Sequence, residues 1–166
     1  NEAWTRVDEP GIYRGQCTEL CGKNHGFMPV VVKAVPQEEY AAWVSEQKAA
    51  AEQERELTQK DWTMAELMER GEKAYQTTCA ACHQADGSGA PPAFPALKGS
   101  KIATGDMAAH IDIVVNGKAG TAMQAFGSQL SEVDLAAVIT YERNAWGNNT
   151  GEMVTPKEIF DYKNQQ

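Results

Sequence analysis

The sequence has no long hydrophobic run. Its longest apolar stretches, residues 28–32 and 136–139, fall far short of the roughly 18 to 20 residues that a membrane-spanning helix needs. No leader with a charged start and an apolar centre follows Asn1, and no internal repeat is visible. These absences exclude a membrane span within these residues and a repeat architecture.

Positive charge is also scarce. The 15 lysines and arginines are outnumbered by 23 acidic residues, which gives a net charge of −8, and the acids are spread over both halves. Because nucleic-acid binding needs a basic surface, nucleic acid is excluded as a partner. An acidic surface can steer a basic protein partner or simply keep the chain soluble, and both interpretations stay open. A length of 166 residues allows one ordinary domain or two small ones.

Cysteine and histidine are few, but they are grouped. The four cysteines form two close pairs, Cys17/Cys21 and Cys79/Cys82, and a histidine follows each pair. A disulfide framework spreads its cysteines over a shorter chain, whereas tight groups of two cysteines and a histidine hold metals or cofactors. The grouping therefore predicts two cofactor sites.

The first part of the chain has strand-like patterns. A turn signal lies at residues 9–11 and a β-branched run at 30–35. Residues 37–60 contain no glycine or proline and are rich in Gln, Glu, Ala and Lys. We expect a β fragment over 1–36, followed over 37–61 by a helix that becomes a charged linker.

The second part, residues 62–166, reads as mainly α. Six residues recur at helical spacing and mark one buried face: Met64, Leu67, Met68, Gly71, Ala74 and Tyr75. The Gly/Pro-rich stretch 87–99 predicts a loop. Cap signals predict helices over 106–116 and 131–145 and a last short one from Thr155. The fold class predicted for the whole chain is mainly α.

The pattern Cys-x-x-Cys-His at residues 79–83 is typical of c-type haem attachment. Two thiols at this spacing reach the two vinyl groups of one porphyrin, and the adjacent imidazole faces the iron. A zinc site would need about two further ligands nearby, and a redox-active pair would sit in a βαβ pattern; neither is present. We predict covalent haem c on Cys79 and Cys82 with His83 as an axial ligand.

The second axial ligand is predicted to be a methionine. Met64 and Met68 lie on the buried helical face, and Met107 sits in the first turn of a helix, whereas Met123 lies in an irregular loop. We therefore predict that Met123 is the second axial ligand. His110 is expected to be an ordinary residue of a helix surface. With both axial positions filled the iron cannot easily bind oxygen, so this haem should carry electrons and catalyse nothing.

Residues 62–148 resemble class I cytochromes c. The matching pieces are Gly71 and Tyr75, Ala93–Leu97, the Met123 loop, and a terminal helix with Tyr141 and Trp146-Gly147. The resemblance implies that Gly71, Ala74 and Tyr75 pack against the terminal helix around Ala137 and Tyr141. It also implies that the carbonyl of Pro95 orients the imidazole of His83.

The first cysteine pair belongs to a different kind of site. Cys17, Cys21, His25 and Met28 form a soft donor set that suits copper in electron transfer, and two thiolates on one loop can bridge two metal ions. A Cys17–Cys21 disulfide would leave His25 and Met28 unexplained, and a partial zinc site is a further alternative. We predict binuclear copper.

Residues 15–29 resemble the binuclear copper loop shared by oxidase subunit II and nitrous-oxide reductase, both built on a cupredoxin β-sandwich. Glu19 favours the oxidase, where the resemblance implies a backbone carbonyl on copper and a carboxylate on a Mg ion. The family's second histidine lies upstream, but no histidine precedes His25. We therefore expect residues 1–36 to be a truncated fragment without its sheet partners, and these 166 residues alone not to assemble a normal binuclear centre.

The order of copper loop, helix, linker and cytochrome is similar to that of caa-type oxidases. The resemblance implies an oxygen-reducing, proton-pumping enzyme in which electrons pass from a donor cytochrome or quinol–cytochrome c reductase to haem c, then copper, then haem a in subunit I. It also implies a place at the periplasmic face of the bacterial inner membrane, with anchoring by missing N-terminal helices. An independent electron carrier or haem redox sensor, and a nitrous-oxide reductase relative, are the competing hypotheses.

Overall fold

The computed structural model describes residues 4–19, 21–22 and 25–165. Within them the chain is helical apart from one two-stranded sheet, and it divides into two compact units, residues 1–51 and 52–166. No helix in the described ranges is long and apolar enough to cross a membrane. The first unit contains the predicted copper site, and the second contains the predicted haem site.

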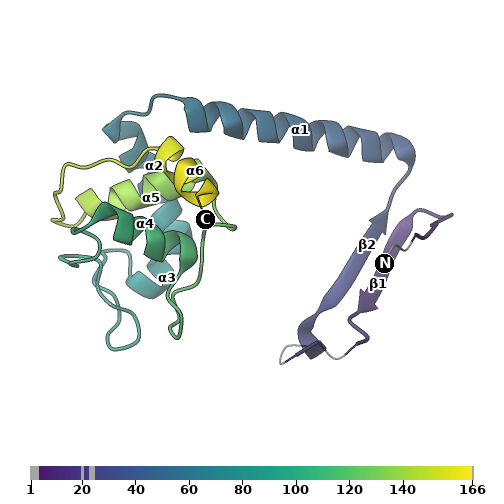
Figure 1. The fold of residues 1–166 in the computed structure, drawn as a ribbon, viewed down its shortest axis with the longest axis horizontal. Helices are drawn as coiled ribbons and strands as arrows, with labels where there is room; N and C mark the ends of the chain where they lie inside the picture. The colour runs from purple at the N-terminus through teal and green to yellow at the C-terminus, as the bar shows by residue number, and fades with distance from the viewer. Residues whose placement is uncertain (1–3, 20, 23–24, 166) are drawn as a thin grey trace. The chain divides into compact units, whose positions relative to one another are not determined.

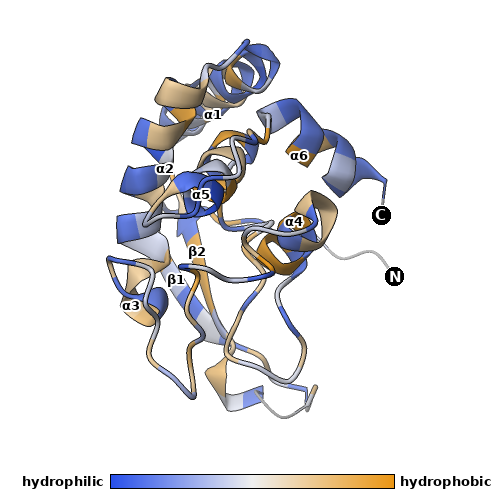
Figure 2. Ribbon diagram, turned by 90° about the vertical axis from the view of Figure 1, so that its left-hand side faces the viewer, coloured by the Kyte–Doolittle hydropathy of each residue, from blue (hydrophilic) through white to orange (hydrophobic). Residues whose placement is uncertain are grey.

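The first unit contains an antiparallel hairpin of β1 (Gly11–Gln16) and β2 (Pro29–Ala34), labelled in Figure 1. Gly11 pairs with Ala34 and Gln16 with Pro29, so the strands are in register along their whole length. A 3-10 turn, η1 (His25–Phe27), precedes β2. The valines of β2, Val30, Val31 and Val32, are at least half exposed, and much of this strand is coloured as hydrophobic in Figure 2. An isolated two-stranded hairpin is marginal in water, and this one has no apolar layer against it among the described residues.

Helix α1 (Gln37–Gln59) follows Pro36 and crosses the division between the units. Glu38 and Glu39 lie in its first turn, where they interact favourably with the helix dipole. No residue of α1 is buried. The charged half, which we expected to form a linker after the helix, is itself helical to Gln59 because it contains no glycine or proline.

The second unit is a helical domain centred on two packed helices, α2 (Met64–Thr78) and α5 (Glu132–Asn144). A Cβ on Gly71 would lie 2.1 Å from the backbone oxygen of Ala137, so the helices cross where α2 has no side chain. The rings of Tyr75 and Tyr141 lie 5.6 Å apart at the same contact. The predicted packing of Gly71 and Tyr75 on the helix at 137–141 is confirmed.

Three further helices complete this unit: α3 (Ala80–His83), α4 (Met107–Asn116) and α6 (Pro156–Asn164). Asp106 caps α4 and Ser131 caps α5 as predicted, and Thr155 forms a reciprocal capping box with Glu158 at the start of α6. Apolar residues of α2, α4, α5 and α6 share one core; among them are Tyr75, Val114, Leu135, Ile139 and Ile159.

Candidate haem and copper sites

A single helical turn brings together Cys79, Cys82 and His83. Cys79 ends α2 and begins α3, and its carbonyl accepts hydrogen bonds from the backbone N–H groups of Cys82 at 3.1 Å and His83 at 2.9 Å. All four cysteines of the chain are free thiols. The turn therefore presents two unpaired thiols and an imidazole on one short segment.

The Cys79 thiol is partly buried at the end of α2. Burial raises its pKa to about 12, and the nearby Glu142 charge adds to the effect. The neutral thiol is therefore the favoured form of Cys79 in the chain by itself.

His83 is held by the loop that follows α3. Its Nδ1 lies 2.9 Å from the carbonyl oxygen of Pro95. Because a carbonyl oxygen only accepts, Nδ1 must carry the proton, which leaves Nε2 free to bind a metal. Gly89 lets the loop fold this closely, since its φ is +67° and a Cβ there would lie 2.6 Å from the Pro95 oxygen. The contact is the one that the cytochrome resemblance implies.

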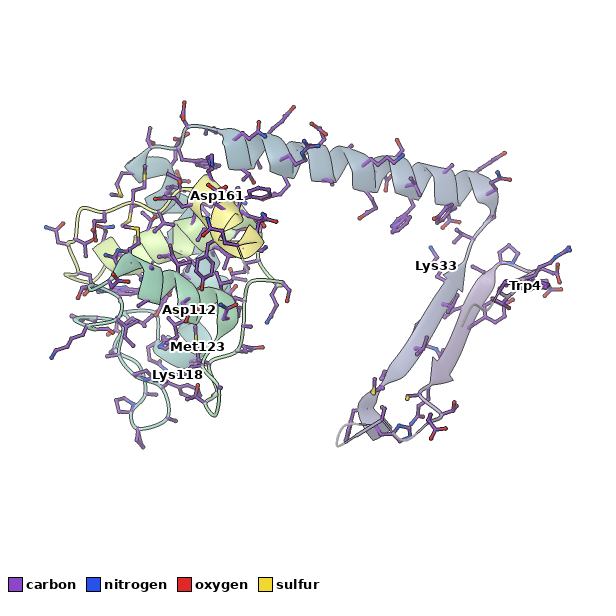
Figure 3. The ribbon with its side chains drawn as sticks, viewed as in Figure 1. Trp4, Lys33, Asp112, Lys118, Met123 and Asp161 are labelled. Carbon is purple, nitrogen blue, oxygen red and sulfur yellow. The ribbon has the colours of Figure 1, made fainter. Side chains whose placement is uncertain are left out.

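Met123 lies on the loop between α4 and α5, where Figure 3 labels it beside Lys118. Its carbonyl accepts from Lys118 N at 2.9 Å, and its own N–H donates to Thr121 Oγ1 at 3.2 Å. The side chain is half-buried against the core cluster, together with Met107 and Phe126. The thioether is thus on a fixed loop at the edge of the apolar interior.

His110 is not a surface residue, and that prediction was wrong. Its side chain is 2% exposed, and its Nε2 lies 2.9 Å from Glu142 Oε2 in α5. The physical reason is that His110 shares the buried face of α4 with Ile111, Val114 and Val115. The spacing i, i+1, i+4, i+5 was the available signal, but nothing local points to the acid opposite.

Glu142 is a buried acid that the sequence analysis did not single out. Besides contacting His110, its charge contributes, after burial, to raising the pKa of Tyr75 and of Cys79. The charge of Glu142 therefore acts on groups at the end of α2, next to the turn of residues 79–83. Glu142 comes close to the end of α2 only through tertiary packing, so no local sequence signal indicates it.

The first unit brings the predicted copper ligands together at the end of its hairpin. The ligand atoms of Cys17, Cys21 and His25 all lie within 4.8 Å of one another, and no other group of this kind occurs among the described residues. Cys21 Sγ is 3.2 Å from the thioether sulfur of Met28. The cluster forms because Cys17 N donates to Met28 O at 3.2 Å and so extends the hairpin pairing.

Glu19 contributes through its backbone. Its carbonyl oxygen accepts from Cys17 Sγ at 3.2 Å, which directs this oxygen toward the thiols. The sulfurs of Cys17 and Cys21 are 3.5 Å apart and not bonded, so the structure contains no disulfide here. Two thiols, an imidazole, a thioether and a carbonyl form a donor set that suits copper.

The second histidine of a binuclear centre is not supplied by this chain. Of its three histidines, only His25 lies in the copper loop. His83 is bonded to Pro95 and His110 to Glu142. The residues present thus fit part of a binuclear copper site.

Two protein-family models match the two units in order. Residues 1–35 match "Cytochrome C oxidase subunit II, periplasmic domain", and residues 66–141 match "Cytochrome C oxidase, cbb3-type, subunit III". A cytochrome c oxidase subunit 2 of Alkalihalophilus pseudofirmus is 31% identical over 154 residues, which cover 87% of this chain. The chain is a cytochrome c oxidase subunit 2 relative with a cytochrome c domain.

Other relatives of subunit 2 match the first part of the chain only. A probable subunit 2 of Rickettsia bellii is 56% identical over 52 residues, or 31% of this chain and 19% of that protein. A mitochondrial subunit 2 of Vigna unguiculata is 51% identical over 47 residues, or 28% of this chain and 12% of that protein. The chain spans 42% of the Alkalihalophilus protein, so it covers less than half of that relative. The family of the first unit implies copper, and that of the second implies haem c.

Proposed function

We propose that this chain transfers electrons within a terminal oxidase, from an external donor to the cytochrome unit, on to the copper unit, and then to subunit I. The observation that carries the proposal is the pair of sites: a Cys-Cys-His turn with a carbonyl-oriented imidazole, and a separate cluster of soft donors. When bound, haem c and copper would supply the one-electron chemistry.

In the cytochrome unit, Cys79 and Cys82 would hold haem c through thioether bonds. His83 would be one axial ligand, with Pro95 fixing its tautomer, and Met123 the other. A filled pair of axial positions suits electron transfer and not oxygen binding. No group of the unit is assigned a catalytic role.

In the copper unit, Cys17, Cys21, His25, Met28 and the Glu19 carbonyl would bind copper, and the Glu19 carboxylate would reach a Mg ion at subunit I. We propose that the hairpin belongs to a cupredoxin sandwich whose other strands would cover the exposed valines of β2. The parent subunit would be anchored at the periplasmic face of the inner membrane.

Full function is tested in the complete subunit, which carries both centres. After flash reduction of the cytochrome unit, we expect the copper unit to be reduced at a rate that does not depend on protein concentration, because α1 joins the two units covalently. Transient absorption at the bands of each centre measures this. A rate that rises in proportion to concentration would show that the two units serve separate partners, as an independent carrier would.

A protein of only these 166 residues should not form the normal binuclear copper centre. The described donors lack the second imidazole, so added copper should bind without the mixed-valence EPR signal of a binuclear site. Adding free imidazole is the matched test, because it can take the place of the second histidine ligand and so allow the mixed-valence signal to form. A normal mixed-valence signal without added imidazole would contradict this prediction.

A further inference from the structure

Asn148 lies just after α5 and is almost completely buried, with 4% of its surface exposed. Its Oδ1 accepts from Gly99 N at 2.7 Å, and its Nδ2 donates to Leu97 O at 3.0 Å and to Glu142 O at 2.7 Å. A primary amide has two N–H donors and one carbonyl acceptor. All three hydrogen-bonding groups of the Asn148 amide are therefore used, and they join the end of α5 to the segment 97–99.

That segment continues directly from the carbonyl that orients His83. Leu97 is two residues after Pro95, and its N–H donates to Gly87 O at 2.8 Å while its carbonyl accepts from Asn148. On the other side of Pro95, Ala90 and Phe94 exchange backbone hydrogen bonds of 2.8 and 3.1 Å. The Pro95 peptide is thus held from both ends, and Asn148 is the side chain that holds the later end.

We propose that Asn148 is a positioning residue for electron transfer: by fixing residues 97–99 it sets the direction of the Pro95 carbonyl at His83 Nδ1. This inference rests on the proposed haem c function. A firm Nδ1–H···O bond makes an axial imidazole more basic, which favours the oxidised iron. Loss of the Asn148 contacts frees the carbonyl to turn, weakens that bond and favours the reduced iron.

The test is the reduction potential of the haem-loaded chain with Asn148→Ala. We expect a rise that corresponds to about a tenfold shift toward the reduced form, which is the lower end of the effects of residues that orient metal-bound histidines. For one electron this is about 59 mV. Spectroelectrochemical titration gives the potential, and NMR of the His83 Nδ1 proton should show faster exchange with water.

Two controls separate this role from loss of stability. Thr140→Val removes a buried hydroxyl that accepts from Val154 N at 3.0 Å and donates to Val154 O at 3.3 Å, so it destabilises the same unit without touching residues 95–99. Asn149→Ala changes the exposed neighbour. Both should keep the wild-type potential and the slow Nδ1 proton exchange.

A potential for Asn148→Ala equal to that of Thr140→Val would overturn the proposal, whatever the loss of stability. Should Asn148→Ala not fold, Asn148→Ser, which keeps one hydroxyl for hydrogen bonding, carries the same test with the same expected direction. Failure of the haem function itself is seen separately, because the wild-type chain would then lack a c-type haemochrome.

Discussion

Replacing His110 by leucine should destabilise the cytochrome unit by about 1 to 3 kcal/mol, the usual cost of leaving a buried polar group without its hydrogen-bond partner. The Glu142 side chain is 5% exposed and has His110 as its side-chain partner. Without the imidazole, the buried Glu142 side chain loses its hydrogen bond to His110, and leucine offers no replacement donor. Urea denaturation followed by circular dichroism measures the change in the free energy of unfolding.

The double variant His110→Leu/Glu142→Leu is the matched control. Replacing both partners of a buried pair by apolar residues is often neutral or stabilising, so most of the lost stability should return. If the double variant is as unstable as the single one, the loss comes from the shape of the site and not from an unpaired Glu142 side chain.

Replacing Gly71 by alanine should cost about 3 kcal/mol, at the upper end of the penalties for overpacking. The added methyl group would meet the Ala137 oxygen at 2.1 Å and the Tyr141 Cβ at 2.7 Å. A backbone oxygen cannot move without moving α5, so the helices must separate. Thermal unfolding of the variant gives the size of the effect.

Glu72→Ala is the comparison for Gly71→Ala, because Glu72 is the exposed next residue of α2. A surface substitution of this kind should change stability by no more than about 0.5 kcal/mol. Wild-type stability for Gly71→Ala would contradict the close crossing of α2 and α5.

The parts of the fold that follow from local sequence could be predicted. Asp106, Ser131 and Thr155 cap α4, α5 and α6 because an N-cap depends on a few neighbouring backbone groups. The six-residue face of α2 predicted its packing, and Gly71 and Tyr75 lie at the contact with α5. These signals are short in range, so they can be read from the chain alone.

Partnerships between distant residues could not be predicted in the same way. The burial of His110 depends on Glu142, which lies 32 residues later on another helix. Asn148 likewise meets Leu97 and Gly99 across about 50 residues. From sequence alone a polar residue is predicted to be exposed, because its burial depends on a hydrogen-bond partner that only the folded chain brings to it.

The two predicted sites differ in how much of them lies in this chain. The spacing of residues 79–83 predicts the proposed haem-attachment turn, and the loop to Pro95 supplies a carbonyl that contacts His83 Nδ1. For copper, the loop brings Cys17, Cys21, His25 and Met28 together, but no sequence signal here provides a second imidazole. The haem assignment can therefore be tested in this chain, whereas the copper assignment needs the complete subunit.

The proposed function depends first on haem c being held by Cys79, Cys82 and His83. The most direct measurement is a pyridine haemochrome assay, with a reduced-minus-oxidised optical spectrum, on the chain expressed with haem-attachment machinery. We expect one c-type haem per chain that stays with the protein after denaturation and is lost when Cys79 and Cys82 are both replaced by alanine. A wild-type chain without a c-type signal, or with a haem that is released on denaturation, would contradict it.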